Sequence, residues 1–478
     1  MQGYNLRRYY DKQPDITKEK MEVNKSIFRE NDIRGTYPEQ LNEFTIGEIG
    51  KAIAIKCKKE NIGSISVGRD GRLSGESLLD AFCESLVSAG INVTNIGMVT
   101  SPMLYFEAKI NDTKSGIIIT GSHNPKNHNG LKMVINDKPI SGTEVLSLIE
   151  DIKDEIAEKG TLKTKDIKED YLNKVTQSVS ISNPSNYKVV IDCGNGAAGC
   201  IAPELFKRVG CEVIELFSEV DGNFPNHHPD PSKLENLQDL IESVLNNNAD
   251  LGLAFDGDGD RVGLITNTGE NIFPDKYMMM LSESILSKES GAIVFDVKCS
   301  NHLDELIVRN NGMPVMAPTG HFHIKKTIKE NNALLGGEMS GHIFFNDKWY
   351  GFDDGPYSGA RIIEALSEYP DGKSISDIMN TYPKSFSTPE LNIDVTDENK
   401  FQIIEDFIDQ NNLEGEENTI DGLRVNYENG WGLIRASNTS PKLVLRFEGN
   451  SIEDMHYIQN EFLSELARIS PDIVINLT

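Results

Sequence analysis

The sequence predicts an α/β fold with three α/β domains, each built on a mixed, mostly parallel sheet, followed by a smaller C-terminal α+β domain. Two observations predict this fold class. Short β-branched runs alternate with helical patterns from about residue 44 to residue 368, and strands separated by helices are typical of parallel sheets covered by helices. The chain also has 478 residues, which at about 150 residues per domain corresponds to three or four domains.

The expected elements follow one another along the chain. The strands expected in the first three domains are Ser64–Val67, Val93–Ile96, Gly116–Thr120, Val189–Asp192, Glu212–Leu216, Leu251–Phe255, Val262–Thr266, Ala292–Phe295 and Val315–Ala317. After residue 388 the expected order becomes strand Leu391–Val395, helix Asn399–Asp409, strands Leu423–Tyr427, Gly432–Ala436 and Leu443–Phe447, and helix Ile452–Ile469. This order indicates a mainly antiparallel α+β domain.

Breaks in the pattern indicate where the domains meet. They fall near Ile167, Glu270–Asp275 and Tyr382–Thr388. The predicted domains are therefore residues 25–167, 168–270, 271–383 and 384–478. Residues 1–24 show no hydrophobic periodicity, and we expect them to form a flexible N-terminal extension.

The charge and composition of the chain exclude several classes of protein. Its formal net charge of −27 repels phosphate backbones and acidic membranes, which excludes general nucleic-acid binding. With 38% hydrophobic residues the chain is not intrinsically disordered. No uncharged apolar run approaches the roughly 18 residues that span a bilayer, so we expect no membrane association, and we expect no signal peptide or anchor. The six cysteines lack disulfide-framework or zinc spacing, which favours reduced thiols in a cytoplasmic protein.

The most specific motif is an acidic loop directly after the predicted strand Leu251–Phe255. Residues 256–261 read Asp-Gly-Asp-Gly-Asp-Arg, and carboxylates at alternate positions of a turn suit Mg²⁺ or Ca²⁺. An EF-hand is the obvious alternative, but that motif needs Gly at its sixth position and Glu at its twelfth, where this chain has Arg261 and Asn267. The predicted metal ligands are Asp256, Asp258 and Asp260.

Three further polar loops also follow strands or apolar runs. Residues 120–125, Thr-Gly-Ser-His-Asn-Pro, present the hydroxyl of Ser122, although a serine in such a turn often only caps its own backbone. Residues 337–342, Gly-Glu-Met-Ser-Gly-His, offer groups that bind sugar hydroxyls, with a plain glycine-rich turn as the alternative. Residues 435–441, Arg-Ala-Ser-Asn-Thr-Ser-Pro, suit a phosphate oxyanion, with an ordinary polar hairpin as the alternative.

Two other patterns invite a functional interpretation that we reject. Residues 194–199 match G-x-G-x-x-G after a strand, and Glu215 follows about twenty residues later, as in dinucleotide-binding folds. The same domain carries the three-aspartate loop, for which hydride transfer has no use, so we interpret these glycines as a tight turn. His227 and His228 are adjacent, so their side chains diverge, and we interpret them as part of a rigid loop and not as a metal pair.

The four loops, in this order and spacing, resemble those of the α-D-phosphohexomutase superfamily, in particular its bacterial phosphomannomutase/phosphoglucomutase branch. The resemblance runs from about Ser26 to the C-terminus and includes residues 32–35 (Asp-Ile-Arg-Gly), 129–132 (Asn-Gly-Leu-Lys), 296–299 (Asp-Val-Lys-Cys), 319–321 (Thr-Gly-His) and 351–355 (Gly-Phe-Asp-Asp-Gly). It implies three related α/β domains and a smaller α+β domain around a central cleft, to which each domain contributes one loop.

The resemblance also implies a role for individual residues. Ser122 would carry a phosphoryl group, and one Mg²⁺ would be held by the three aspartates and an oxygen of that phosphate. Arg34, Lys132 and His342 are the candidates for proton transfer and charge stabilisation, without a decision on which is the base, and Arg261 would add positive charge. The implied substrate-binding residues are Lys298, His321, Glu338, Met339, Ser340, Gly341, His342, Arg435, Ser437, Asn438 and Thr439.

The implied reaction interconverts the 1- and 6-phosphates of mannose and of glucose. Phosphoserine would give its phosphoryl group to the free hydroxyl of the hexose phosphate, and the hexose 1,6-bisphosphate would reorient and return its other phosphate to Ser122. The bisphosphate is thus both intermediate and activator, and the expected partners are hexose phosphates with no obligate protein partner. Catalysis would consist mainly of positioning and charge neutralisation.

One position departs from the family, and three other functions remain open. The branch usually has Tyr where this chain has Asn31, so that aromatic substrate contact is not expected here. Phosphoglucosamine mutase is the nearest alternative, but Met339 and Gly121 stand where glucosamine mutases commonly have Gln and Ala. The more distant alternatives are a nicotinamide-dependent dehydrogenase and a non-catalytic phosphosugar-binding protein.

Overall fold

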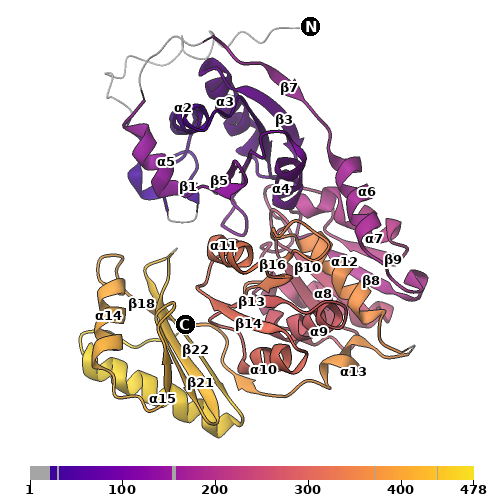
Figure 1. Ribbon diagram of the computed structural model, residues 1–478, viewed down its shortest axis with the longest axis vertical. Coiled ribbons are helices and arrows are strands. Elements are labelled where there is room, and N and C mark those ends of the chain that lie inside the picture. Colours follow the sequence, from indigo (N-terminus) through magenta and orange to yellow (C-terminus); the bar gives the residue numbers. More distant parts are fainter. Residues whose placement is uncertain (1–21, 30–31, 153–157, 371, 439, 478) are drawn as a thin grey trace.

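Four β-sheets in succession organise the chain, as the computed structural model shows (Figure 1). The structure describes residues 22–29, 32–152, 158–370, 372–438 and 440–477. The predicted extension, apart from residues 22–24, lies outside the described residues, as do Asn31 and Thr439. Mixed sheets covered by helices confirm the predicted fold class, while the domain boundaries stay a prediction.

The first sheet has seven strands and is mostly parallel in its centre. Its region contains η1 (Lys25–Ile27), β1 (Ile33–Thr36), α2 (Glu43–Lys59), β2 (Ser64–Arg69), α3 (Gly75–Ser88), β3 (Asn92–Met98), α4 (Ser101–Ile110), β4 (Gly116–Ile119), β5 (His128–Ile135), β6 (Lys138–Pro139), α5 (Gly142–Ile149) and β7 (Leu162–Thr164). Polar side chains begin several helices here, because they accept the first free backbone N–H groups. Asn42, for example, accepts the N–H of Thr45 at 3.0 Å.

The second and third sheets have five and four strands. The second region contains α6 (Lys168–Ser178), η2 (Pro184–Asn186), β8 (Lys188–Asp192), η3 (Ala197–Cys200), α7 (Ala202–Arg208), β9 (Glu212–Leu216), η4 (Leu234–Leu237), α8 (Gln238–Asn247), β10 (Leu251–Phe255), β11 (Val262–Thr266) and β12 (Asn271–Ile272). The third contains α9 (Pro274–Leu286), β13 (Ala292–Asp296), α10 (Asn301–Arg309), β14 (Met313–Ala317), α11 (His321–Asn331), β15 (Leu335–Gly337), β16 (Ile343–Phe345), α12 (Gly355–Leu366) and α13 (Ile375–Met379).

The fourth sheet is antiparallel throughout its described pairings. It is formed by β17 (Phe386–Ser387), β18 (Leu391–Asp394), β19 (Glu416–Asn418), β20 (Leu423–Tyr427), β21 (Gly430–Ala436) and β22 (Lys442–Gly449), with helices α14 (Lys400–Gln410) and α15 (Ile452–Ile469). Figure 1 shows α15 along one side of this sheet, at the lower left of the molecule. The predicted antiparallel α+β arrangement is therefore correct.

The first three sheets share one topology, which explains where the polar loops lie. Each contains two neighbouring parallel strands, a third strand parallel to the first of them, and a fourth strand antiparallel to the third: β4 with β5, β10 with β11 and β15 with β16. In the first sheet, β1 precedes these four strands and pairs antiparallel with β5. The loops at 120–127, 256–261 and 338–342 each join such an antiparallel pair. Three of the four predicted loops therefore occupy equivalent positions in three related sheets.

The buried cores show how tightly the parts are joined. One hydrophobic cluster runs from Ile96 to Tyr382 and joins the second and third regions to one side of the first. The fourth region has its own cluster, which begins at Ile393 and ends at Leu466. Its hydrophobic link to the third region is a small contact of Val297 with Trp431 and Leu433, and buried polar contacts such as Arg446 to the carbonyl of Lys298 add to it. The fourth region thus has its own hydrophobic core and is joined to the third largely by polar contacts.

The sequence analysis did not predict β5 and β16, which are the second strands of the antiparallel pairs in the first and third regions. Strand β5 begins with His-Asn-Gly and β16 has only three residues, so neither shows a β-branched run. Every strand that the sequence predicted is present, with ends that agree to within two residues. Among the described residues, the helices are all too short or too polar to cross a bilayer.

Candidate active site

Ser122 lies in the loop after β4 with its backbone in the left-handed region, at φ 47°. A non-glycine residue rarely adopts this conformation, and such strain concentrates at functional sites. The N–H of Ser122 donates to Thr120 Oγ1 at 2.8 Å, which helps to hold the turn. Its buried hydroxyl donates to Asp256 Oδ2 at 2.9 Å. The structure therefore joins the serine loop to the acidic loop.

Arg72 holds the serine loop from behind. This residue, only 1% exposed, donates from one terminal nitrogen to the carbonyls of Ser122 and Asn124, at 2.7 and 2.6 Å. The other terminal nitrogen donates to the carbonyls of Pro125 and His128, at 2.6 and 2.9 Å. One guanidinium thus fixes four carbonyls, a geometry for which its planar fork is suited.

Two glycines allow the serine loop to lie this close to its neighbours. A Cβ on Gly121 would lie 2.3 Å from Arg72 Nε, and a Cβ on Gly257 would lie 2.4 Å from the carbonyl oxygen of Ser122. Asp70 adds a second support, because its Oδ2 accepts the N–H of Gly121 at 3.0 Å. Any side chain at residue 121 or residue 257 would have to displace the loop that carries Ser122.

The three predicted metal ligands converge. One oxygen each of Asp256, Asp258 and Asp260 lie within 4.8 Å of one another, and all three residues are fully buried. The Oδ1 atoms of Asp258 and Asp260 have no hydrogen-bond partner. Buried carboxylate oxygens this close repel one another unless a cation or a donor compensates them. The donor set fits a hard divalent cation.

The backbone of the acidic loop is a junction between three parts of the chain. The carbonyls of residues 257–259 accept, in order, the N–H groups of Ala197 at 2.9 Å, Ser101 at 2.9 Å and Gly355 at 3.1 Å. Ser101 and Gly355 begin helices α4 and α12. Helix N-termini carry partial positive charge, which favours an acidic cluster beside them.

Lys132 supplies the nearest full positive charge to the acidic loop. Its Nζ lies 2.7 Å from Asp258 Oδ2 and also contacts Asp260 Oδ2. Burial lowers the pKa of Lys132, but Asp258 and Asp260 outweigh it and hold that pKa well above its usual range. Conversely, burial and Asp260 raise the pKa of Asp258, but Lys132 outweighs them and lowers it. Lys132 is therefore a charged hydrogen-bond donor in this arrangement.

Arg34 lies on β1, where it pairs with Gly130 of β5, two positions before Lys132. Its Nε lies 2.5 Å from Asp32 Oδ2.

Burial and the positive charges of Arg261 and Arg34 hold the pKa of His123 well below its usual range. His123, which the sequence analysis did not single out, lies with Nδ1 3.2 Å from Ser122 Oγ.

His342 lies between the acidic loop and the third sheet. Its Nε2 accepts a hydrogen bond from Arg261 Nε at 2.9 Å, so in the neutral ring Nδ1 carries the proton. That nitrogen faces Asp353 Oδ2 at 3.4 Å. Burial and Arg261 hold the pKa of His342 well below its usual range. The charged or ionisable side chains of Lys132, Arg34 and His342 are thus placed beside the serine loop and the acidic loop.

Asp353 connects several of these groups, although the sequence flagged it only as part of a matched segment. Its Oδ1 forms an ion pair with Lys325 at 2.6 Å, and His321 Nδ1 lies 3.9 Å from its Oδ2. Asp260, His342 and Asp353 form a second group of close potential ligands. Lys325 and Arg261 already place positive charge against that group, which disfavours a second cation there.

Glu338 occupies the loop between β15 and β16. Its Oε2 accepts the N–H of Gly320 at 2.9 Å, and its buried Oε1 has no partner. Burial and the charge of Asp296 raise the pKa of Glu338 to about 8. The loop itself is held by a hydrogen bond from the N–H of Val262 to the carbonyl of Gly341 at 3.1 Å. Ser340 is partly exposed, whereas Met339 packs against the large core.

Lys298 joins the third region to the fourth. Its Nζ lies 3.1 Å from Glu390 Oε2 and 3.7 Å from Asp296 Oδ2. Burial lowers the pKa of Lys298, but the two carboxylates outweigh it and raise that pKa. The lysine in turn lowers the pKa of Glu390 to about 2. Glu390 was not predicted, because it lies outside every recognised motif.

Arg435 is linked to the third region through Asp421. Its Nε lies 2.9 Å from Asp421 Oδ2, and the same oxygen accepts the N–H of Thr319 at 2.9 Å. In the adjoining hairpin, Ser437 Oγ accepts the N–H of Ser440 at 3.2 Å. Asn438 is partly exposed, and Thr439 lies outside the described residues. The structure thus brings the predicted phosphate loop against the Thr-Gly-His segment.

The two rejected patterns have structural roles. Residues 194–199 lead into a short 3-10 helix, and a Cβ on Gly196 would lie 2.9 Å from the backbone of Gly257. These glycines therefore let the turn pack against the acidic loop. His227 contacts Asp192 at 3.0 Å, while His228 Nε2 contacts the carbonyl of His123 beside Ser122. The two imidazoles diverge, as expected, and His228 supports the serine loop.

The arrangement can carry out phosphoryl transfer. It combines a strained, buried serine hydroxyl, three carboxylates that can hold a divalent cation, and the nearby positive charges of Lys132, Arg34 and Arg261. Phosphoryl transfer depends on such positioning and charge neutralisation. The support roles of Arg72, Asp70, Lys325 and Glu390 were missed because their contacts are with residues distant in sequence. Residues 123 and 353 lay inside recognised segments, but no role was assigned to their side chains.

Comparison with known protein families gives matches along most of the chain. Models for the phosphoglucomutase/phosphomannomutase alpha/beta/alpha domains I, II and III match residues 25–160, 169–269 and 273–386. The model for the phosphoglucomutase/phosphomannomutase C-terminal domain matches residues 390–465.

Similar proteins extend over nearly the whole chain. A phosphomannomutase/phosphoglucomutase of Pseudomonas syringae pv. tomato is 49% identical over 453 residues, covering 94% of this chain and 96% of that protein. A phosphoglucomutase of Neisseria gonorrhoeae is 46% identical, covering 92% and 96%. A crystal structure of a phosphoglucomutase/phosphomannomutase family protein from Burkholderia thailandensis, 40% identical, superposes with a TM-score of 0.89 and covers 95% of this chain and all of that one.

Proposed function

Since the chain belongs to the phosphoglucomutase/phosphomannomutase family, we propose that its own residues 122, 256, 258 and 260 carry out the reaction of a phosphohexomutase. The enzyme is an isomerase of the phosphomannomutase/phosphoglucomutase type. Its proposed substrates are the 1- and 6-phosphates of mannose and glucose. The observation that carries the proposal is the hydrogen bond from Ser122 Oγ to Asp256, inside the cluster of three buried aspartates.

Ser122 is the proposed phosphoryl carrier. In the first half-reaction the bond from phosphorus to Ser122 Oγ breaks while a bond forms to the free hydroxyl of the hexose phosphate. That hydroxyl loses its proton, and Ser122 Oγ regains one when it is released. After the hexose 1,6-bisphosphate reorients, the second half-reaction runs in the opposite direction with the other phosphate. The bisphosphate is thus the intermediate, and added bisphosphate would activate unphosphorylated enzyme.

The three aspartates are the proposed ligands of one Mg²⁺, together with an oxygen of the phosphate on Ser122. Their unpartnered oxygens and shared burial support this assignment. A bound Mg²⁺ supplies positive charge to the transferring phosphoryl group. Lys132 contacts two of the same carboxylates, so it is placed to neutralise charge that the cation does not.

Three further residues are proposed to handle protons and charge around Ser122. Arg34 and Lys132 project from neighbouring strands and stabilise negative charge on the phosphoryl group. His342 presents a neutral imidazole whose Nδ1–H faces Asp353, and the proposed proton-transfer group is one of Arg34, Lys132 and His342. Arg261, which donates to His342 Nε2, orients the ring and adds positive charge.

The remaining predicted residues are proposed to bind the substrate. Glu338, with Ser340 and the backbone at Gly341, lies where sugar hydroxyls would be bound. The phosphate that does not react is proposed to be held by Arg435, Ser437, Asn438 and Thr439. Further substrate contacts are proposed for Lys298 and His321. The Arg435 loop belongs to a region with its own hydrophobic core, and we propose that this region moves as a unit to close on either phosphate after the intermediate reorients.

A cytoplasmic location is also proposed. All six cysteines are free and five of them are buried. Reduced thiols of this kind are typical of proteins in a reducing compartment.

The test measures phosphorylation and turnover in one preparation. Intact-mass measurement after incubation with glucose 1,6-bisphosphate is expected to show an addition of about 80 Da, the mass of one phosphoryl group. Conversion of mannose 1-phosphate and glucose 1-phosphate with Mg²⁺ is then followed by phosphorus NMR. Ser122→Ala is expected to lose both the added mass and the turnover.

The matched control is Ser77→Ala, which removes an exposed hydroxyl from helix α3 and is expected to keep both properties. Undiminished turnover by Ser122→Ala would overturn the assignment of the phosphoryl carrier. Turnover of glucosamine 6-phosphate in place of both hexose phosphates would replace the proposed substrates while leaving the role of Ser122 intact.

A further inference from the structure

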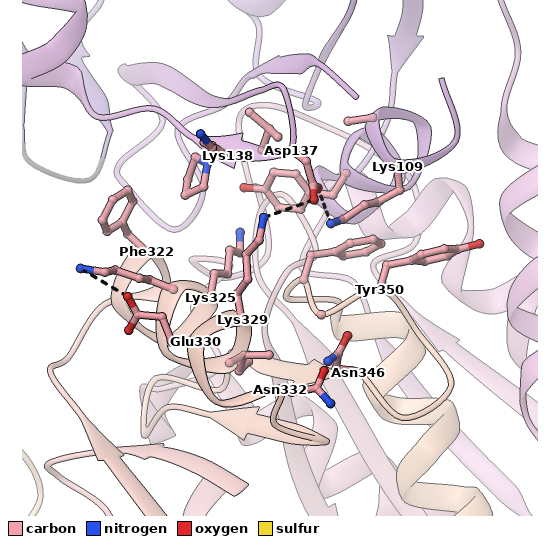
Figure 2. Close-up of a pocket in the computed structure, with 18 residues that line it drawn as sticks. Lys109, Asp137, Lys138, Phe322, Lys325, Lys329, Glu330, Asn332, Asn346 and Tyr350 are labelled. Carbon is pink, nitrogen blue, oxygen red and sulfur yellow. Dashed lines mark hydrogen bonds and ion pairs between the residues drawn. The ribbon is translucent and has the colours of Figure 1, made fainter. Parts of the chain in front are cut away.

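A cavity lined by none of the four polar loops lies between the first and third regions. Helix α4 and the β5–β6 hairpin form one side, and helix α11 with the loop after β16 forms the other (Figure 2). Its volume is about 580 Å³, within the range of roughly 300–1,000 Å³ that small-molecule sites occupy. The cavity is therefore large enough for a ligand of ordinary cofactor size.

The cavity concentrates positive charge in a chain whose net charge is −27. Asp137 and Glu330 are the acidic residues in its wall, and they face a larger number of lysines. These are Lys109, Lys138, Lys325, Lys326 and Lys329. Both Lys109 and Lys329 contact Asp137, the latter at 3.6 Å across the two regions. Because one carboxylate compensates both ammonium groups, the cavity keeps an excess of positive charge for a ligand.

Aromatic and aliphatic side chains form the rest of the wall. Tyr350 and Phe352 are parallel, with ring centres 6.1 Å apart, and Lys325 Nζ lies 4.0 Å from the centre of the Tyr105 ring. Figure 2 shows Phe322 and Tyr350 on either side of the central Lys325 and Lys329. The aliphatic members are Ala108, Val134, Pro139 and Ile328. A ligand that fits this wall needs a flat or apolar body besides its negative charge.

We propose that this cavity binds a nucleotide, with its phosphates on the lysines and its base against the aromatic side chains. Lysine is a common phosphate ligand because its ammonium is a compact point charge. Purine and pyrimidine rings stack on aromatic side chains. A nucleotide combines a polyanion with a flat ring, which is the combination that this wall accommodates.

The position of the cavity connects such a ligand to the active site. Lys325 lines the cavity and also forms the 2.6 Å ion pair with Asp353, which faces His342. The lysines come from both sides, since Lys109 and Lys138 precede the second region while Lys329 lies on α11. A bound nucleotide would therefore hold α11 against the β5–β6 hairpin.

The test measures binding of ADP to the full-length enzyme by calorimetry, with glucose 1,6-bisphosphate present at saturation to occupy the active site. Pyrophosphate and adenosine are measured in parallel. We expect ADP to bind more tightly than either. The double variant Lys138→Ala/Lys329→Ala should weaken ADP binding at least about tenfold, since a tenfold change corresponds to about 1.4 kcal/mol and each lost phosphate contact is charge-assisted. Lys163→Ala, at an exposed position of β7, is the matched control and should bind as the wild type does.

Hydrogen exchange gives the second measurement. Added ADP should slow amide exchange both in α11 and in the β5–β6 hairpin of the wild type, and not in the double variant. The proposal is overturned if ADP fails to bind, if the double variant binds ADP as the wild type does, or if pyrophosphate binds as tightly as ADP. Protection confined to the loops around Ser122 would also overturn it.

Discussion

Arg72 should be as necessary for turnover as a residue that touches substrate, although it lies behind the serine loop. Its guanidinium donates to the carbonyls of Ser122, Asn124, Pro125 and His128, and it is almost fully buried. Arg72→Met keeps a long apolar stem but removes all of these donors. The four carbonyls then lose their charged partner inside the protein, as does Asp70, whose Oδ2 lies 3.3 Å from Arg72 Nε.

The size of the effect follows from these contacts. A hydrogen bond to a charged group contributes about 1.5–3 kcal/mol, so four of them set an upper limit of roughly 6–12 kcal/mol before the desolvation of the guanidinium is subtracted. Removing one partner of a buried charge pair costs about 3–5 kcal/mol in practice. We expect the free energy of unfolding to fall by about 3–5 kcal/mol, and the first thermal transition to fall by about 6–20 °C.

Turnover should fall further than stability alone would require. A displacement of a reacting group by about 1 Å can reduce the rate about 100-fold, and the backbone of Ser122 is among the groups that Arg72 holds. We therefore expect kcat for glucose 1-phosphate to fall by about 100-fold at a temperature where the variant is folded.

The assay combines differential scanning calorimetry with steady-state kinetics below the first transition. Arg69→Met is the control, because Arg69 is partly exposed and donates to the carbonyl of Asp70 at 2.9 Å; its loss should cost about 1 kcal/mol or less. An Arg72→Met enzyme that melts and turns over as the wild type does would refute the reasoning.

Three further predictions concern the loops around the site. Gly257→Ala should reduce kcat at least about tenfold because its Cβ would lie 2.4 Å from the carbonyl oxygen of Ser122. The control is Gly47→Ala in α2, where the added Cβ has open space and kcat should stay unchanged. Equal kinetics of the two variants would contradict this prediction. Asp258→Asn should raise the Mg²⁺ concentration needed for half-maximal activity, and chelation with EDTA should abolish wild-type turnover; a Mg²⁺ titration that superposes on that of the wild type would show that this carboxylate is not a ligand. The pKa of Glu338 is raised to about 8, so the folded protein keeps the carboxyl proton of Glu338 at pH values where the unfolded chain has lost it. The free energy of unfolding should therefore fall as pH rises from about 4.5 to about 8, with a slope of at most about 1.4 kcal/mol per pH unit. Glu338→Gln should remove that part of the slope in denaturant titrations at several pH values, and an unchanged slope would show that Glu338 is ionised in the folded state.

The sequence alone determined the fold class and the identity of the four loops. Strands such as Leu251–Phe255 are β-branched or apolar runs bounded by turns, and this signal is local, so it survives without any knowledge of tertiary contacts. The acidic loop was equally visible, because Asp256, Asp258 and Asp260 lie within five residues of one another and glycines separate them. Conversely, β5 and β16 were missed, since antiparallel pairing with a neighbour defines them more than their own composition does.

The contacts that build the site were decided only by the tertiary structure. Ser122 and Asp256 are 134 residues apart in the chain and meet because equivalent loops of two sheets point at each other. Arg72 lies 50 residues before Ser122 and shows no motif, yet it holds the loop. The charge states of Lys132, His342 and Glu338 depend likewise on burial and on distant partners. A sequence records which groups are available, but desolvation and Coulomb energies depend on distances that exist only after the chain has folded.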